Sequence, residues 1–97
     1  MTDENHPDNG VEDYGTKEWV AESMRMDYDR YLEYKEHATQ GMLIFGDKFV
    51  EALGFALSEA DDRNAVKLMR LFRNECSSHE MIYRMHQAKE KALGASA

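Results

Sequence analysis

The last third of the sequence carries side chains that could bind a transition metal. His79, Tyr83 and His86 follow one another at spacings of four and three residues, so they share one face of a helix. Imidazole and phenol side chains in such a pattern can bind Zn²⁺ or iron. Cys76 lies three residues before His79 and could form a nucleophilic pair with it. No glycine turn that could stabilise an oxyanion accompanies the pair, so we expect no enzymatic activity.

His37 could complete the cluster if the chain folds back on itself near residue 61. Such a hairpin would place His37 opposite His86 and near the glutamates of its own helix. A metal site formed by His37, His79 and His86 between subunits is therefore one hypothesis. The helical bundles that bind two iron ions carry Glu-x-x-His motifs, however, and this sequence contains none. The alternative is a layer of hydrogen-bonded histidines that fixes the packing of the helices, and we expect no cofactor.

Basic residues form a stripe along the predicted helix that follows residue 61: Arg63, Lys67, Arg70 and Arg73. The dipole of a helix disfavours cations in its first turns, so an anion should lie nearby. One interpretation is a phosphate-bearing nucleotide held by Arg63, Lys67 and Arg70 between subunits. The other is a solvated, salt-bridged helix face. Four cations on an acidic chain are too few for duplex nucleic acid, which we do not expect as a partner.

Two sets of residues indicate a contact surface for protein. The first part of the chain is rich in aromatic residues of the kind enriched at protein interfaces. In residues 46–60, small side chains recur at four-residue steps and allow another helix to approach closely. The alternative for both sets is packing inside the chain, which for the small residues means packing against residues 65–76. The predicted interface residues are Trp19, Tyr28, Tyr31, Tyr34, Gly46, Val50 and Gly54.

The composition is that of one small folded domain with an acidic start. The 97 residues are 42% hydrophobic and 32% charged, and the formal net charge is −7. Much of the excess acid lies in residues 1–15, which we expect to be a disordered tail. One cysteine cannot form an internal disulfide, and we expect neither a signal peptide nor a membrane span. These features favour the cytoplasm.

The elements that would position these residues are helices. Proline occurs only at position 7, and apolar residues recur every three or four positions. After an N-cap at Thr16 we expect helices over residues 17–39 and 42–59, nearly collinear or kinked at Gly41 or Gly46. The unbroken apolar pattern also allows a single helix over both segments. If the break falls at Gly46, Asp47 could cap the new helix.

Asp61 or Asp62 should cap the last helix, over residues 63–92, after a short turn. A short connection makes two helices antiparallel neighbours. We therefore predict an all-α fold for residues 16–93: an antiparallel helical hairpin of two long helices, followed by a short C-terminal tail, residues 94–97, that begins at Gly94. A hairpin of this size leaves an apolar stripe exposed, so we expect a dimer or larger oligomer that completes a helical bundle.

Residues 45–72, FGDKFVEALGFALSEADDRNAVKLMRLF, combine an aromatic residue, ALG, an AL-x-x-AD turn, an Asn and a Leu-rich helix. This pattern is similar to that of small phage- and prophage-encoded helical proteins. The resemblance implies no catalytic residue. Many such proteins have no assigned activity, whereas others inhibit or sequester components of the host. We predict a non-enzymatic interaction protein that binds a host or partner protein. The alternatives are the ligand-binding oligomer described above and a structural subunit of a larger assembly.

Overall fold

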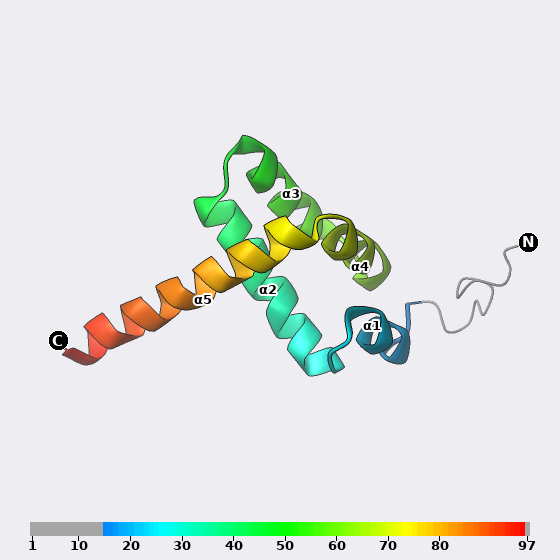
Figure 1. The fold of residues 1–97 in the computed structure, drawn as a ribbon, viewed down its shortest axis with the longest axis horizontal. Helices are drawn as coiled ribbons and strands as arrows, with labels where there is room; N and C mark the ends of the chain where they lie inside the picture. The colour runs from blue at the N-terminus through cyan, green and yellow to red at the C-terminus, as the bar shows by residue number, and fades with distance from the viewer. Residues whose placement is uncertain (1–14, 97) are drawn as a thin grey trace, which may run out of the picture.

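The structure is a computed structural model that describes residues 15–96, and its secondary structure over this range is entirely helical (Figure 1). The predicted all-α fold class is thus confirmed. The disordered tail predicted for residues 1–15 lies, apart from Gly15, outside the described residues, and so does Ala97. The helices are α1 (Lys17–Met24), α2 (Tyr28–Phe45), α3 (Lys48–Glu59), α4 (Asp62–Leu71) and α5 (Arg73–Ser96).

Four of these helices begin at an oxygen-bearing side chain that accepts a hydrogen bond from the backbone N–H three residues later. The distances are 3.1 Å from Trp19 N to Thr16, 2.8 Å from Arg30 N to Asp27, 2.9 Å from Val50 N to Asp47 and 2.9 Å from Asn64 N to Asp61. Each such cap contributes about 0.5–2 kcal/mol to stability. The predicted caps at Thr16, Asp47 and Asp61 are therefore confirmed, whereas the cap at Asp27 was not predicted.

The first predicted long helix is divided into three. The break between α1 and α2 falls at Arg25, which adopts the left-handed conformation with φ 58° and ψ 42°. The predicted break at Gly41 is wrong, because α2 continues through it without interruption. The second break lies instead at Gly46, directly before the Asp47 cap.

Gly41 has a packing role that could not be recognised from the sequence. A Cβ at this position would overlap the backbone carbonyl oxygen of His79 and lie 2.8 Å from its carbonyl carbon. Only glycine allows the α2 and α5 backbones to approach this closely. Gly41 thus marks the contact between two helices rather than the end of one.

The second predicted long helix is also divided. Phe72, with φ −110° and ψ 49°, separates α4 from α5, and no glycine or proline in the sequence signals this break. Its ring packs against Phe49 of α3 with a centroid distance of 5.8 Å. At the other end, α5 runs through Gly94 to Ser96, so Gly94 does not end the helix as predicted.

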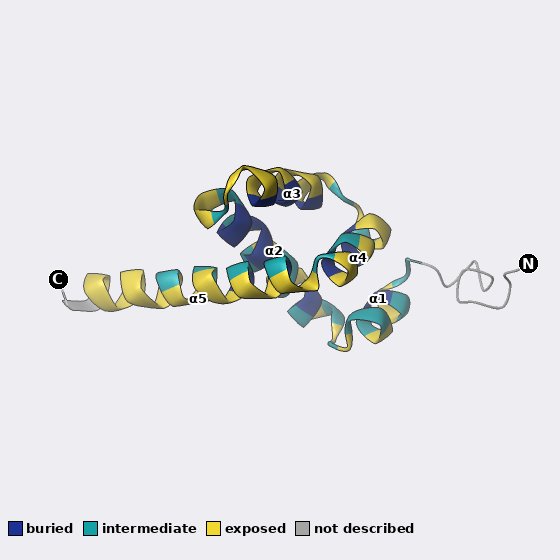
Figure 2. Cartoon of the chain, turned by 45° about the horizontal axis from the view of Figure 1, so that its top comes forward, coloured by how far each residue is buried: buried dark blue, intermediate teal, exposed yellow. Residues whose placement is uncertain are grey.

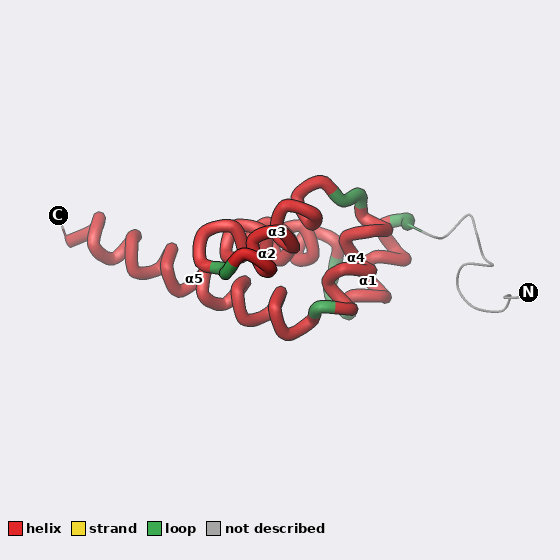
Figure 3. Tube along the Cα trace, turned by 90° about the horizontal axis from the view of Figure 1, so that it is seen from above, coloured by secondary structure: helices red, strands yellow, loops and turns green. Residues whose placement is uncertain are grey.

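The helices are arranged around α2. Helix α3 turns back beside α2, α5 crosses α2, and α1 packs against α4 (Figures 1 and 3). The short turn predicted near residue 61 lies where expected, but α3 packs mainly against α2 rather than against α4. The chain therefore differs from the predicted two-helix hairpin. The closely packed pair that includes α3 is α2 with α3, and these two helices are joined by the Gly46–Asp47 turn.

The buried core draws on α1 to α4 and very little on α5 (Figure 2). Cys76 is the only buried apolar residue of α5 within the described range, and Glu80 is the last buried residue of that helix before Gly94. No described helix is long and apolar enough to cross a membrane. The buried apolar residues are Val20, Tyr31, Ala38, Met42, Val50, Leu53, Leu57, Ala65, Val66, Met69 and Cys76.

Candidate functional site

A large accessible apolar surface lies on the C-terminal half of α5. Beyond its crossing with α2 this helix projects from the body of the molecule (Figure 1). Four large apolar side chains of the projecting segment are exposed: Met81 to 51%, Ile82 to 39%, Met85 to 64% and Leu93 to 59%. At about 100° per residue they fall within an arc of about 120° on one side of the helix. We refer to these four residues as the α5 stripe.

The side of α5 that faces α2 is polar. Glu80 and Tyr83 lie on this side, and the Tyr83 ring is 5.4 Å from the His37 ring of α2. The apolar side of α5 therefore points outward, which is the reverse of the usual arrangement for a helix packed on a core. Phe45, at the end of α2, adds to the accessible apolar surface beside α5, where its ring lies 5.3 Å from the His86 ring.

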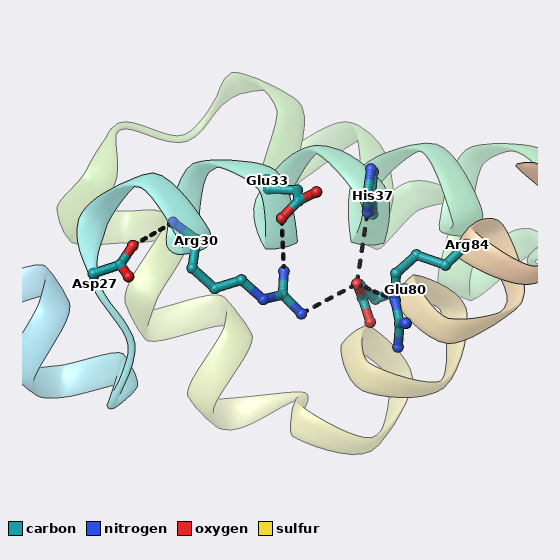
Figure 4. A network of polar contacts seen from close by, with 6 residues as sticks. All are labelled: Asp27, Arg30, Glu33, His37, Glu80 and Arg84. Carbon is teal, nitrogen blue, oxygen red and sulfur yellow. Dashed lines mark hydrogen bonds and ion pairs between the residues drawn. The ribbon is translucent and has the colours of Figure 1, made fainter.

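A buried carboxylate, Glu80, joins α5 to α2 (Figure 4). Glu80 is only 3% exposed. Its Oε2 lies 2.8 Å from Nε of Arg84, 3.6 Å from Nη2 of Arg30 and 3.6 Å from Nδ1 of His37. Arg30 also pairs with Glu33 at 3.6 Å. A buried carboxylate is costly unless it is paired, and the two arginines supply compensating positive charge and one hydrogen bond.

The Glu80 cluster is incompletely satisfied. Nη1 of Arg30 and Nδ1 of His37 are buried and have no hydrogen-bond partner among residues 15–96. Only the Arg84 contact has hydrogen-bond geometry. The cluster therefore fixes the position of α5 on α2 through charge rather than through a full set of hydrogen bonds.

The three histidines of the predicted metal site are not brought together. His37 pairs with Glu80, His79 hydrogen-bonds through Nδ1 to the Glu75 carbonyl at 2.8 Å, and His86 lies 3.9 Å from Glu90. In the part of the chain that the structure describes, no three His, Cys, Asp or Glu side chains form a group that could hold a metal ion. On α5 the ring next to His37 is that of Tyr83, whereas the His86 ring lies against Phe45.

Cys76 lacks the character of a nucleophile in this fold. The side chain is fully buried in the core, and burial raises the pKa of the thiol to about 11. The thiolate, which is the reactive form, is therefore scarce at neutral pH. The ring nitrogen Nδ1 of His79 is engaged with the Glu75 carbonyl rather than with Cys76.

The tyrosines predicted at an interface form contacts inside the chain. Tyr28 and Tyr31 both donate hydrogen bonds to Asp62, at 2.6 and 2.9 Å, and so connect the start of α2 to α4. Tyr31 is fully buried, and its burial together with the Asp62 hydrogen bond raises its pKa. Trp19 and Tyr34 are half-buried and pack against the core. Their burial does not support an interface at these positions.

The small residues predicted at an interface are also used internally. Gly54 faces Met42 and Leu43 of α2 rather than residues 65–76, and Val50 is part of the core. A Cβ at Gly54 would lie 3.1 Å from Met42 Cβ. Gly46 is half-buried in the turn between α2 and α3. These residues explain the close contact of α3 with α2, so their burial does not support a subunit interface there.

The residues of the predicted anion-binding stripe have different neighbours in the structure. Arg63 lies against Gly15, where a Cβ would come within 2.6 Å of its Cγ. Arg70, by contrast, lines a pocket together with Arg25 and Arg73. Arg63 and Lys67 are not among the residues that line this pocket. Of the three residues of the predicted site, only Arg70 therefore belongs to this pocket.

Sequence reasoning missed two features of α5. Glu80 was not singled out in the sequence, and the α5 stripe was not recognised because attention fell on His79, Tyr83 and His86, which share another side of the helix. The signal was present: Met81, Met85 and Leu93 recur at multiples of four residues, on a side of the helix away from His79 and Tyr83. When two rows of apolar or aromatic residues lie on different sides of one helix, one of the rows must face away from the core.

No family model, curated protein or solved structure matches this chain. The fold and the surface features thus define it only as a small all-α protein in which one helix, α5, has an exposed apolar side.

Proposed function

We propose that this chain is a non-enzymatic helical interaction protein that binds another polypeptide through the α5 stripe. The observation that carries the proposal is the absence of any buried residue in α5 between Glu80 and Gly94, although this segment holds four large apolar side chains. An isolated helix of this length is only marginally stable in water, so packing of its apolar side is the main source of order available to it.

The stripe has the properties of a binding surface. Covering a large aliphatic side chain fully is worth about 1.5–3 kcal/mol, so four partly exposed ones can supply several kcal/mol. Two of the four are methionines, whose flexible side chains adapt to different partner surfaces. Lys89 lies within the same arc, because it is four residues after Met85 and four before Leu93. The favoured partner is an amphipathic helix with a carboxylate opposite Lys89.

The resemblance of residues 45–72 to phage-encoded helical proteins supports a host protein as the partner and inhibition or regulation as the outcome. The single, buried cysteine is in keeping with action in the cytoplasm, as proposed from the sequence.

A second candidate is self-association, in which the stripe of one copy packs against the stripe of another. The same exposed segment favours it, since a second copy is always present at the concentration of the chain itself. Such pairing would complete a helical bundle from two copies, which is the finer architecture expected from the sequence. The chain would then be a structural or regulatory homo-oligomer.

A pair of charge substitutions tests the proposal. Ile82→Lys with Met85→Lys places two charges on the stripe, and Gln87→Lys places one on the opposite side of the same segment as a matched control. Binding of the purified wild-type chain to candidate helical partners and to itself is measured by sedimentation velocity over a range of concentrations. Helical content is measured by circular dichroism for all variants.

We expect the stripe variant to lose association at least about tenfold, while the control retains it. Loss of a self-associated species alone would assign the stripe to the homo-oligomer, and loss of a complex with a second protein would assign it to a partner. Equal association of the stripe variant and the wild-type chain, with both folded, would refute the proposal.

A further inference from the structure

A pocket of about 550 Å³ lies where the end of α1 meets the junction between α4 and α5. Its size is within the range of small-molecule sites, about 300–1,000 Å³. The polar residues that line it come from four helices or their ends: Ser23 and Arg25 at the end of α1, Tyr34 of α2, Arg70 of α4, and Arg73 and Ser77 of α5. This pocket is separate from the α5 stripe.

The lining of the pocket is positively charged. It contains three arginines and no Asp or Glu. Within residues 15–96, none of these three guanidinium groups forms an ion pair with a carboxylate. Arg30 and Arg84 differ in this respect, because each of them pairs with the Glu80 carboxylate. Three cations that share one concave surface repel each other unless an anion lies between them.

The remaining lining is suited to a phosphate group with an organic part. Two serine hydroxyls, Ser23 and Ser77, can donate hydrogen bonds to phosphate oxygens. The phenol of Tyr34 is neutral at physiological pH, and burial raises its pKa further, to about 12. Met24, Met26 and Met69 supply apolar walls beside the arginines. Guanidinium groups bind phosphate through paired, charge-assisted hydrogen bonds.

The backbone at Arg25 supports a role for its side chain. Arg25 ends α1 in the left-handed conformation, φ 58° and ψ 42°, and its N–H bonds to the Ala21 and Glu22 carbonyls. This position is usually occupied by glycine or asparagine, since a side chain there is disfavoured. The local backbone therefore gives no reason for arginine, whereas the pocket does.

We propose that this pocket binds the phosphate group of a small phosphate-bearing molecule through Arg25, Arg70 and Arg73. The site differs from the stripe expected from the sequence, because it excludes Arg63 and Lys67 and includes Arg25. Its ligand is independent of the partner of the α5 stripe.

Isothermal titration of the full chain at low ionic strength tests the site with two probes, inorganic phosphate and phenyl phosphate. Arg25→Gly removes one guanidinium and leaves a residue that favours the local backbone, so this variant should be at least as stable as the wild-type chain. Arg73→Gln removes a second guanidinium. Lys67→Gln removes one charge from α4 outside the pocket and is the matched control.

We expect saturable binding that weakens at least about tenfold in Arg25→Gly and in Arg73→Gln and by less than about threefold in Lys67→Gln. Tighter binding of phenyl phosphate would assign a phosphate ester as the ligand, and tighter binding of inorganic phosphate would assign the free anion; either result supports the site. Absence of saturable binding for both probes would overturn the proposal. An equal loss in Lys67→Gln would also overturn it, because the effect would then come from overall charge.

The phosphate pocket and the α5 stripe can be tested independently of each other. Ile82→Lys with Met85→Lys should leave phosphate binding unchanged, and Arg25→Gly should leave association unchanged.

Discussion

Substitution of Gly41 by alanine tests the close packing of α2 on α5, because helix propensity alone predicts the opposite effect on stability. Alanine is favoured over glycine inside a helix by about 1 kcal/mol, so propensity predicts a more stable protein. In the structure, however, the added Cβ would overlap the His79 carbonyl oxygen and lie 2.8 Å from the carbonyl carbon and 3.2 Å from His79 Cβ. The obstacle is backbone within a continuous helix, so α5 must move away from α2.

The expected size of the effect follows from these contacts. Forcing an extra carbon into a packed site costs about 1–3 kcal/mol, and displacement of α5 also loosens the contacts of the neighbouring Cys76 and Glu80. After subtracting the gain in propensity of about 1 kcal/mol, and allowing for the loosened contacts, we expect a net loss of about 1–2 kcal/mol. For a chain of this size this lowers the midpoint of thermal unfolding by about 4–16 °C. Circular dichroism at 222 nm during heating measures it.

Gly94 provides the control with the opposite sign. It also lies inside a helix, but a Cβ there would meet no atom within 4 Å. Gly94→Ala should therefore leave stability unchanged or raise it by up to about 1 kcal/mol. If Gly41→Ala proved as stable as the wild-type chain while Gly94→Ala behaved as expected, the close contact of α2 with α5 would be refuted.

Three further substitutions or conditions test the polar and buried groups. Glu80→Gln should destabilise the chain by about 1–3 kcal/mol in urea unfolding, because it removes the buried charge that Arg30 and Arg84 pair with. Glu90→Gln, at an exposed pair, should change stability by less than about 0.5 kcal/mol. Asp62→Ala should cost about 1–3 kcal/mol, because the buried Tyr31 hydroxyl loses its acceptor; a shift below about 0.5 kcal/mol would contradict the hydrogen bond. Burial raises the pKa of Cys76 from 9.0 to about 11, so the folded state binds the proton more tightly than the unfolded state. Its contribution to stability is then complete below pH 9 and is lost as the pH rises through about 11, and Cys76→Ala should show a smaller loss over that interval in unfolding measured at each pH.

The sequence predicted the fold class and three of the four helix caps, because both depend on local chemistry. An oxygen-bearing side chain before an apolar-periodic segment stabilises a helix start wherever the helix lies, so Thr16, Asp47 and Asp61 could be identified without knowledge of the tertiary structure. Asp27 has the same chemistry and could have been identified in the same way. It was overlooked because the apolar pattern continues in phase across the break at Arg25.

The direction in which the chain turns could not be predicted, because it depends on contacts between distant residues. Gly41 was interpreted as a break because glycine weakens a helix. Its role is instead to allow close contact with the backbone of α5, about forty residues later in the sequence. Phe72 breaks a helix with no local signal, and its partner Phe49 lies on α3. The metal hypothesis depended on the same error, because it assumed that residues 37 and 86 face each other across a hairpin.

The Glu80 cluster accounts for the orientation of the α5 stripe. A helix can rotate about its axis, and the burial of apolar side chains would turn Met85 inward if nothing opposed it. Glu80 lies about 140° around α5 from Met85, so a geometry that points Glu80 at Arg30 and His37 must point Met85 at solvent. The contact of Gly41 with the His79 backbone fixes the same face against α2. The exposed stripe is therefore held outward by interactions on the other side of the helix rather than left over from poor packing. It follows that replacing Glu80 by leucine should let α5 rotate toward its apolar side and reduce the exposure of Met85, whereas Met85→Lys should not disturb the cluster.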